Sequence, residues 1–221
     1  VLIPRGGEKL QRMCQRESSI PVIIGGFGIS HIFVDESADL NRCVDIIINA
    51  KTQKPSACNS LDTLLLHEKI AQKFIELLTP KLKDKQVTVF AHGVAYDYFK
   101  DYPYLQEGKS EDLDREFLSL AMNVKVIADV YEAVEQLRLH HASHSDAILT
   151  DSVKNAKIFT HAAGSACVYV NASTRFSDGG QFGLGAEVAI STQKLHARGP
   201  MALQELTTYQ YVCEGDYLTR R

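Results

Sequence analysis

The chain has 221 residues, 45% of them hydrophobic and 23% charged, with a formal net charge of -3. This length is enough for one large domain or two small ones with a buried core. No basic stripe indicates a nucleic-acid-binding protein, no apolar run approaches the roughly 18 residues of a membrane span, and no signal-peptide pattern opens the chain.

The cysteines narrow the class of protein further. Their number, five, is odd, and no CxxC pair occurs, which argues against a disulfide framework and against a zinc ribbon. Cys14 and Cys43 fall within helical patterns and Cys167 within a strand pattern, as buried structural cysteines do. Reduced thiols fit the cytoplasm best, so we expect a cytoplasmic protein without a bound metal.

The first part of the chain predicts short strands alternating with helices. We expect strands at residues 1–3, 20–24 and 32–34. The spacing of Leu10, Met13 and Cys14 predicts a helix between the first two strands. Asp39 is placed to cap a second helix, whose apolar face holds Leu40, Val44, Ile47 and Ile48. An irregular stretch, 51–59, follows.

The rest of the chain continues this alternation. We predict helices at 70–82, 130–139 and 153–162. We predict strands at 63–66, 87–90, 124–127, 147–149 and 166–170, and a β segment at 206–212. Residues 91–115 have weak periodicity and carry no prediction. Strands alternating with helices predict βαβ units and therefore an α/β fold with a largely parallel sheet.

Cys58 is the first candidate for chemistry. It follows Pro55-Ser56-Ala57 in a loop of small residues between a helix and a strand, where a thiol can be exposed. Lys51 or Lys54 could lower the pKa of this thiol. A nucleophile and a small buried hydrophobic residue are both open interpretations of this pattern.

Three histidines and one arginine are further candidates. His31, His144 and His196 each fit a structural histidine, although His144 stands in Ser143-His144-Ser145-Asp146 directly before a predicted strand. Arg175 follows a strand and could bind a carboxylate or phosphate through two hydrogen bonds; a surface ion pair is the alternative. The Gly-rich loop at 179–185 matches no complete phosphate-binding fingerprint.

Three stretches together resemble the gamma-glutamyl phosphate reductase family. They are residues 49–59 around Cys58, residues 144–148, and the long run from 168 through 183–187 to 191–200. The resemblance covers nearly the whole chain and is weakest at about 91–112. One departure lies at Leu139-His140-His141-Ala142, where the family has small residues. The chain has no initiator Met and resembles a C-terminal half, so we expect a longer protein.

The resemblance implies the aldehyde-dehydrogenase-like fold. Residues 1–35 would end a Rossmann-like cofactor-binding domain, of which the chain holds a remnant. Residues 36–166 would form the catalytic domain, 167–199 would return to the cofactor-binding domain, and 200–221 would be an oligomerisation tail. We therefore expect a homo-oligomer that acts on a small molecule, with no nucleic-acid or membrane partner.

The reaction that the resemblance implies is NADPH-dependent reduction of L-glutamyl 5-phosphate to L-glutamate 5-semialdehyde in proline biosynthesis, with release of phosphate. Cys58 would attack the acyl phosphate and form a thioester, which hydride then reduces. The chain alone would be inactive, because most of the cofactor-binding fold would lie outside it.

The resemblance also assigns binding residues. Glu116, Gly25 and Gly26 would contact the cofactor. The substrate anions would be bound by Arg175, with Lys51, Arg198 and His144 as further candidates. In hydrolytic members of the superfamily a glutamate activates water, and counting back from Ala38-Asp39-Leu40 puts that position on Gly25. The chain therefore has no carboxylate there.

Two other functions stay open at this point. A different acyl-thioester-forming aldehyde dehydrogenase, such as one that uses coenzyme A, would share Cys58 but not the run from Arg175 to Pro200. A non-catalytic oligomerising module is the second alternative, because the chain would lack its cofactor half.

Overall fold

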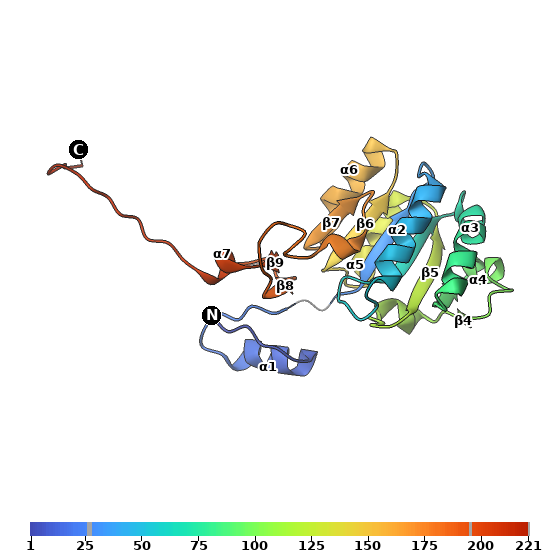
Figure 1. Cartoon of the computed structure of the whole chain (residues 1–221), viewed down its shortest axis with the longest axis horizontal. Coiled ribbons are helices and arrows are strands. Elements are labelled where there is room, and N and C mark those ends of the chain that lie inside the picture. Colours follow the sequence, from blue (N-terminus) through green and yellow to red (C-terminus); the bar gives the residue numbers. More distant parts are fainter. Residues whose placement is uncertain (26–27, 195, 221) are drawn as a thin grey trace.

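The computed structural model describes residues 1–25, 28–194 and 196–220. Its centre is a seven-stranded sheet with the strand order β4-β3-β5-β2-β1-β6-β7, shown in Figure 1. Every neighbouring pair in this sheet is parallel. The strands are β1 (Ser30–Val34), β2 (Leu61–His67), β3 (Thr88–His92), β4 (Leu105–Glu107), β5 (Ala121–Ile127), β6 (Ser145–Leu149) and β7 (Cys167–Val170). The predicted α/β fold is confirmed.

Helices cover both faces of the sheet, because successive strand side chains point to opposite faces. On β1, Ile32 and Val34 pack into the core under α2 (Leu40–Thr52), α3 (Ala71–Asp84) and α4 (Val94–Tyr98). Phe33 packs on the other face, under α5 (Val130–Leu139) and α6 (Val153–Ala162). Both β1 and β2 are buried along their whole length, as expected for strands covered on both sides.

The helix limits follow from the local sequence signals. The Asp39 carboxylate accepts hydrogen bonds from the backbone N–H of Asn41 and of Arg42, at 3.1 and 3.3 Å, which confirms the predicted cap of α2. Asp129 caps α5 and Ser152 caps α6 in the same way. The limits predicted for α5 and α6 are those observed.

Segments from the two ends of the chain lie side by side outside the sheet (Figure 1). They comprise α1 (Glu8–Glu17), β8 (Ala189–Ser191), β9 (Gly199–Met201) and α7 (Leu203–Leu206). Ile23 packs against Ala189 and Met201 in a small core. The Gln193 side chain accepts from Ile24 N at 3.0 Å and donates to Val22 O at 3.3 Å.

Some predicted elements differ from the structure. The predicted strands at 1–3 and 20–24 are reduced to one bridge between them, Leu2 with Val22, and Gly25, just after the second, forms a bridge with Ser191. The predicted β segment at 206–212 is not a strand, because it runs away from the rest of the protein (Figure 1) and pairs with no other described segment; Tyr211 is 85% exposed. The stretch at 91–115 forms α4, β4 and the 3-10 helix η1 (Ser110–Asp114).

The sheet is wider than the predicted catalytic segment. Both β1, which falls in the predicted segment 1–35, and β7, which falls in 167–199, belong to the seven-stranded sheet. The sheet therefore extends beyond residues 36–166 on both sides. The assignment of the flanking segments to a cofactor-binding domain stays a prediction.

The departure from the family pattern at residues 139–142 coincides with an unusual backbone conformation. His141 has a φ of 54°, in the left-handed region that glycine adopts most readily. A glycine at this position would relieve the conformation because it has no Cβ, whereas other small residues would not.

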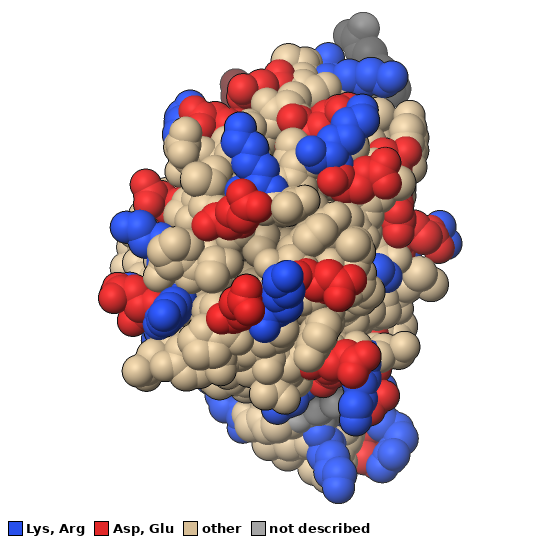
Figure 2. Space-filling view, turned by 90° about the vertical axis from the view of Figure 1, so that its right-hand side faces the viewer, with Lys and Arg blue, Asp and Glu red and all other residues tan. Residues whose placement is uncertain are grey.

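The surface carries both signs of charge. On the face seen in Figure 2, basic and acidic side chains are interspersed and neither sign forms a continuous patch. In the described part of the chain, none of the helices has the length and apolar character that crossing a membrane requires.

Candidate active site

The loop that carries Cys58 is fixed by its neighbours in sequence. Asn59 is buried; its Nδ2 donates to Ser177 O at 2.8 Å, and its carbonyl accepts from Thr174 Oγ1 at 2.7 Å. Ser60 Oγ donates to Ala50 O at 3.3 Å, at the end of α2. These bonds join the loop to α2 and to the 3-10 helix η2 (Thr174–Phe176). Cys58 is thus held in place by residues from distant parts of the chain.

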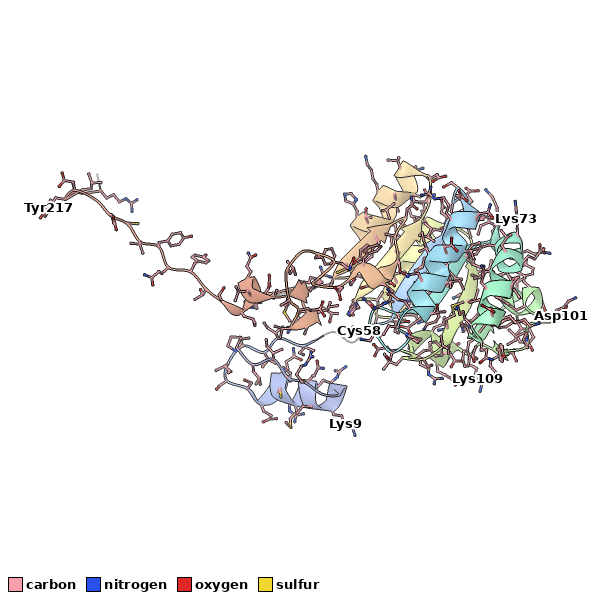
Figure 3. The ribbon with its side chains drawn as sticks, viewed as in Figure 1. Lys9, Cys58, Lys73, Asp101, Lys109 and Tyr217 are labelled. Carbon is pink, nitrogen blue, oxygen red and sulfur yellow. The ribbon has the colours of Figure 1, made fainter. Side chains whose placement is uncertain are left out.

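Cys58 borders two cavities at the end of the sheet body that faces α1 and β8–β9 (Figure 3). A cavity of about 410 Å³ has Cys58, Glu116 and Arg175 in its wall, together with Asp178 and Glu187. A second cavity of about 370 Å³ lies between Cys58 and the N-terminal segment, and Gly25 lines it. The structure therefore brings together four of the residues predicted from the sequence.

The Cys58 thiol is in an environment that favours the protonated form. Burial raises its pKa, as do the nearby carboxylates of Glu116 and Glu187, whereas its own backbone N–H and Arg175 lower it. A favourable side-chain charge comes from Arg175. Lys51 is buried elsewhere, against Ala121 O, whereas Lys54 lines the same cavity as Cys58, and its effect on the pKa stays a prediction. Forming a thiolate at Cys58 requires a proton acceptor.

Glu116 is partly buried beside an acidic neighbour. Burial and the carboxylate of Asp62 raise the pKa of Glu116 to about 7. Asp62 is buried and accepts from Phe117 N at 3.0 Å and from Ser30 N at 3.2 Å. Asp62 therefore fixes the backbone that carries Glu116 against the first strand of the sheet.

Arg175 lies in η2 and lines two neighbouring cavities. Its Nε donates to Gln53 Oε1 at 3.0 Å. The guanidinium lies in the wall of the 410 Å³ cavity and of a neighbouring one of about 310 Å³ that Asp178 also lines. Burial lowers the pKa of Arg175, and Cys58, Asp178 and Glu187 counter this effect. An arginine half-withdrawn from water beside Cys58 is well placed to bind an anion.

Three other predicted residues do not line the cavities at Cys58. Lys51 is fully buried, donates to Ala121 O at 2.9 Å, and has a pKa lowered by burial to about 8. Arg198 is exposed and donates to Gly164 O, away from Cys58. His144 is fully buried. Gly26 lies outside the described residues. These positions do not support a direct role for Lys51, Arg198 or His144 in binding substrate.

The sequence did not reveal the buried polar layer behind the site. Asp62 belongs to this layer, as does the pair in which His31 Nδ1 lies 3.1 Å from Asp146 Oδ1. The Ser177 hydroxyl bonds to Ser145 Oγ at 2.5 Å and to the Tyr169 hydroxyl at 2.7 Å. A charged residue in a mostly apolar strand, such as Asp62 in β2, is the signal that could have indicated it. Among the described residues no cluster of three potential ligands could hold a metal ion.

His144 has a structural environment that penalises its charged form. Its Nδ1 lies 2.8 Å from Ser145 Oγ, and within the described part of the chain its buried Nε2 has no hydrogen-bond partner. Burial lowers the pKa of His144 from 6.5 to about 4, against the opposing effect of Asp146. The side chain is therefore neutral in the folded protein near neutral pH.

This environment predicts a pH-dependent loss of stability. Because the pKa of His144 is lower in the folded than in the unfolded state, the unfolded state gains a proton first as the pH falls below 6.5. Protonation of His144 should thus cost about 2 to 3 kcal/mol of the unfolding free energy between about pH 7 and about pH 4.5. The substitution His144→Asn should remove that part of the loss. Urea unfolding of both proteins at the two pH values measures it, and equal acid losses would contradict the prediction.

Comparison with known proteins agrees with this geometry. The chain is 58% identical over 220 residues to the gamma-glutamyl phosphate reductase of Vibrio vulnificus (strain YJ016), a match that covers 100% of the chain and 53% of that relative. The crystal structure of gamma-glutamyl phosphate reductase from Thermotoga maritima is similar with a TM-score of 0.90 and 45% identity, over 99% of this chain and 52% of that one. No protein-family model matches the chain.

A more distant structure shows the fold alone. The propionaldehyde dehydrogenase of Rhodopseudomonas palustris, solved with bound propionyl-CoA, has a TM-score of 0.62 and 13% identity, over 86% of this chain and 49% of that one. The parallel sheet and these structural likenesses place the chain in the aldehyde-dehydrogenase-like class. Within this class, the chain is similar along its whole length to gamma-glutamyl phosphate reductases. It spans about half the length of the curated relatives that it matches.

Proposed function

We propose that the chain is part of an enzyme that reduces L-glutamyl 5-phosphate to L-glutamate 5-semialdehyde in proline biosynthesis and releases phosphate. The observation that carries this proposal is the position of Cys58, in a fixed loop that borders one cavity with Arg175 and Glu116. Identity of 58% to a protein named gamma-glutamyl phosphate reductase supports it. The enzyme would work in the cytoplasm.

The proposed chemistry divides the work between Cys58 and Arg175. The Cys58 sulfur attacks the acyl carbon and forms a thioester as the bond to phosphate breaks. The Arg175 guanidinium binds the phosphate or the α-carboxylate and holds the acyl carbon at the sulfur. The backbone N–H of Cys58 is a candidate donor to the developing oxyanion.

NADPH would supply the hydride when bound. The 370 Å³ cavity leaves open space beside Cys58 on the side lined by Gly25, and Glu116 lies in the wall of the neighbouring cavity. We propose that Gly25, Gly26 and Glu116 contact the cofactor. Because residues outside this chain would complete the cofactor site, the chain alone is expected to be inactive in reduction.

The alternative that uses coenzyme A has less support. The structure with bound propionyl-CoA shares only 13% of its residues with this chain. The test is an assay of a protein of the relatives' full length that contains this chain. We expect one phosphate released for each NADPH oxidised with freshly made glutamyl 5-phosphate. Oxidation of NADPH by an acyl-CoA, but not by glutamyl 5-phosphate, would overturn the proposal.

Arg175→Lys is expected to raise KM for the acyl phosphate about tenfold or more. A lysine keeps the charge but loses the planar pair of donors, at a cost on the order of 1.5 kcal/mol at a partly desolvated site. Steady-state kinetics of the full-length protein measure KM. Arg198→Lys is the matched control, since Arg198 lies away from Cys58. An unchanged KM for Arg175→Lys would show that Arg175 does not bind the substrate and that its role is the structural bond to Gln53.

The C-terminal tail supports a homo-oligomer as part of the proposal. Residues after α7 are extended and carry exposed apolar side chains, among them Tyr209, Tyr211 and Val212, which are 77%, 85% and 71% exposed. We propose that this tail contacts another copy of the protein, because exposed apolar groups of this kind are usually covered by a partner.

A further inference from the structure

The carboxylates around Cys58 differ in what they are bonded to. Asp178 Oδ1 accepts from Gly180 N and Gln181 N, at 2.9 and 3.1 Å. Glu187 Oε2 accepts from Gly179 N at 2.8 Å. Both carboxylates therefore hold the backbone of the glycine-rich loop. Among the described residues, Glu116 is the acidic side chain in this cavity whose carboxylate has no hydrogen-bond partner.

The histidines near the site are not available as proton acceptors. His31 and His144 are both fully buried, and neither lines a cavity that Cys58 borders. The resemblance puts the position of the superfamily's water-activating glutamate on Gly25, which has no side chain. The Cys58 thiol nevertheless has to lose its proton when it attacks. The geometry leaves Glu116 to receive it.

We propose that Glu116 carries the proton of Cys58 to the departing phosphate during formation of the thioester. The Sγ–H proton passes to a Glu116 carboxylate oxygen as the Sγ–C bond forms. The same proton passes to the bridging oxygen of the phosphate as the C–O bond breaks. Thiol and acyl phosphate thus become thioester and hydrogen phosphate, and Glu116 returns to its carboxylate. This inference rests on the proposed function.

The surroundings of Glu116 suit a group that both takes and gives a proton. Proton transfer is most efficient when the pKa of the carrier is near the working pH, and that of Glu116 is about 7. Asp62 is the positioning residue, because it bonds to Phe117 N and its charge disfavours the charged form of Glu116. The phenyl ring of Phe117 also packs against Phe90, with centroids 5.2 Å apart.

The test compares two reactions of Cys58 in the 221-residue chain. Glu116→Gln removes a negative charge that raises the pKa of Cys58, so alkylation of Cys58 by iodoacetamide should become several-fold faster. Acylation of Cys58 by acetyl phosphate needs the proton carrier and should become about a hundredfold slower. Peptide mass spectrometry follows both reactions at Cys58, and phosphate release follows the second. Neither reaction requires NADPH.

Glu187→Gln is the matched control, because it removes a charge from the same cavity while the amide oxygen can still accept from Gly179 N. It should speed alkylation without slowing acylation. Equal rates of acylation in the wild type and in Glu116→Gln would overturn the role of Glu116 but not the proposed thioester chemistry. Slower alkylation together with slower acylation in Glu116→Gln would also overturn it, since that result indicates a displaced thiol. No acylation of the wild type would overturn both the inference and the proposed thioester chemistry.

Discussion

Replacing Cys58 with serine is expected to lower the rate of acyl-phosphate reduction by at least about a thousandfold in the full-length protein. Serine is nearly the same size, but its hydroxyl is a far weaker nucleophile than the thiol of cysteine. NADPH oxidation with glutamyl 5-phosphate measures the loss. The unfolding free energy should change by less than about 1 kcal/mol, because Cys58 makes its anchoring contacts through Asn59 and Ser60.

Cys213→Ser is the control for this experiment. Cys213 is exposed in the C-terminal tail, so its replacement should leave turnover unchanged. If Cys58→Ser retained near-normal turnover with an intact fold, the assignment of the nucleophile would be wrong. If it unfolded the protein, the loss of activity would have to be tested instead by iodoacetamide modification of wild-type Cys58.

Oxidation of glutamate 5-semialdehyde in the reverse direction is expected to depend on inorganic phosphate, with a stimulation of about a hundred- to ten-thousand-fold. Release of the acyl group to water needs a general base, whose contribution to the rate is of this size. Gly25 borders the cavity beside Cys58 and has no carboxylate, and the carboxylate of Glu187 in the same wall is bonded to Gly179 N. Glu116 faces the cavity that Arg175 shares, where phosphate would bind. The thioester should therefore transfer its acyl group to phosphate much faster than to water.

NADPH formation with and without phosphate measures this dependence. Sulfate at the same ionic strength is the control, because it can occupy an anion site but cannot take up the acyl group in the same way. Equal rates with phosphate and with sulfate would show that water reaches the thioester with the help of another base. His31 cannot be that base, since it is fully buried beside Asp146.

The helices were predictable because their signals are local. Asp39 before an apolar face, and the 3.6-residue spacing in α5 and α6, are enough to define where these helices lie. The strand order was not predictable, because it depends on pairings such as Val34 with both Leu66 and Leu149. The tail at 206–212 has the apolar alternation of a strand, yet a strand also needs a partner.

The site shows the same limit. Cys58, Arg175 and Glu116 were found through motifs. Their common cavity depends on contacts between distant parts of the chain, such as the bond from Phe117 N to Asp62 that holds the backbone next to Glu116. Lys51 stands in the stretch around Cys58 and was expected to bind substrate, whereas α2 turns its side chain into the interior. Composition and spacing cannot show whether a lysine in the last turn of an amphipathic helix, such as Lys51 in α2, is buried or exposed.

The place of β1 in the sheet has a consequence for how the protein folds. One neighbour of β1 is β2, the next strand in sequence, but the other is β6, which follows only after β3, β4 and β5. Until β6 arrives, one edge of this central, fully buried strand is open to any extended chain that can pair with it. Closing so long a connection slows folding, since the entropy of the loop is lost before the new contacts form. Two folding chains that meet at this stage can exchange β6 and β7, which makes strand exchange the characteristic misfolding route of this topology.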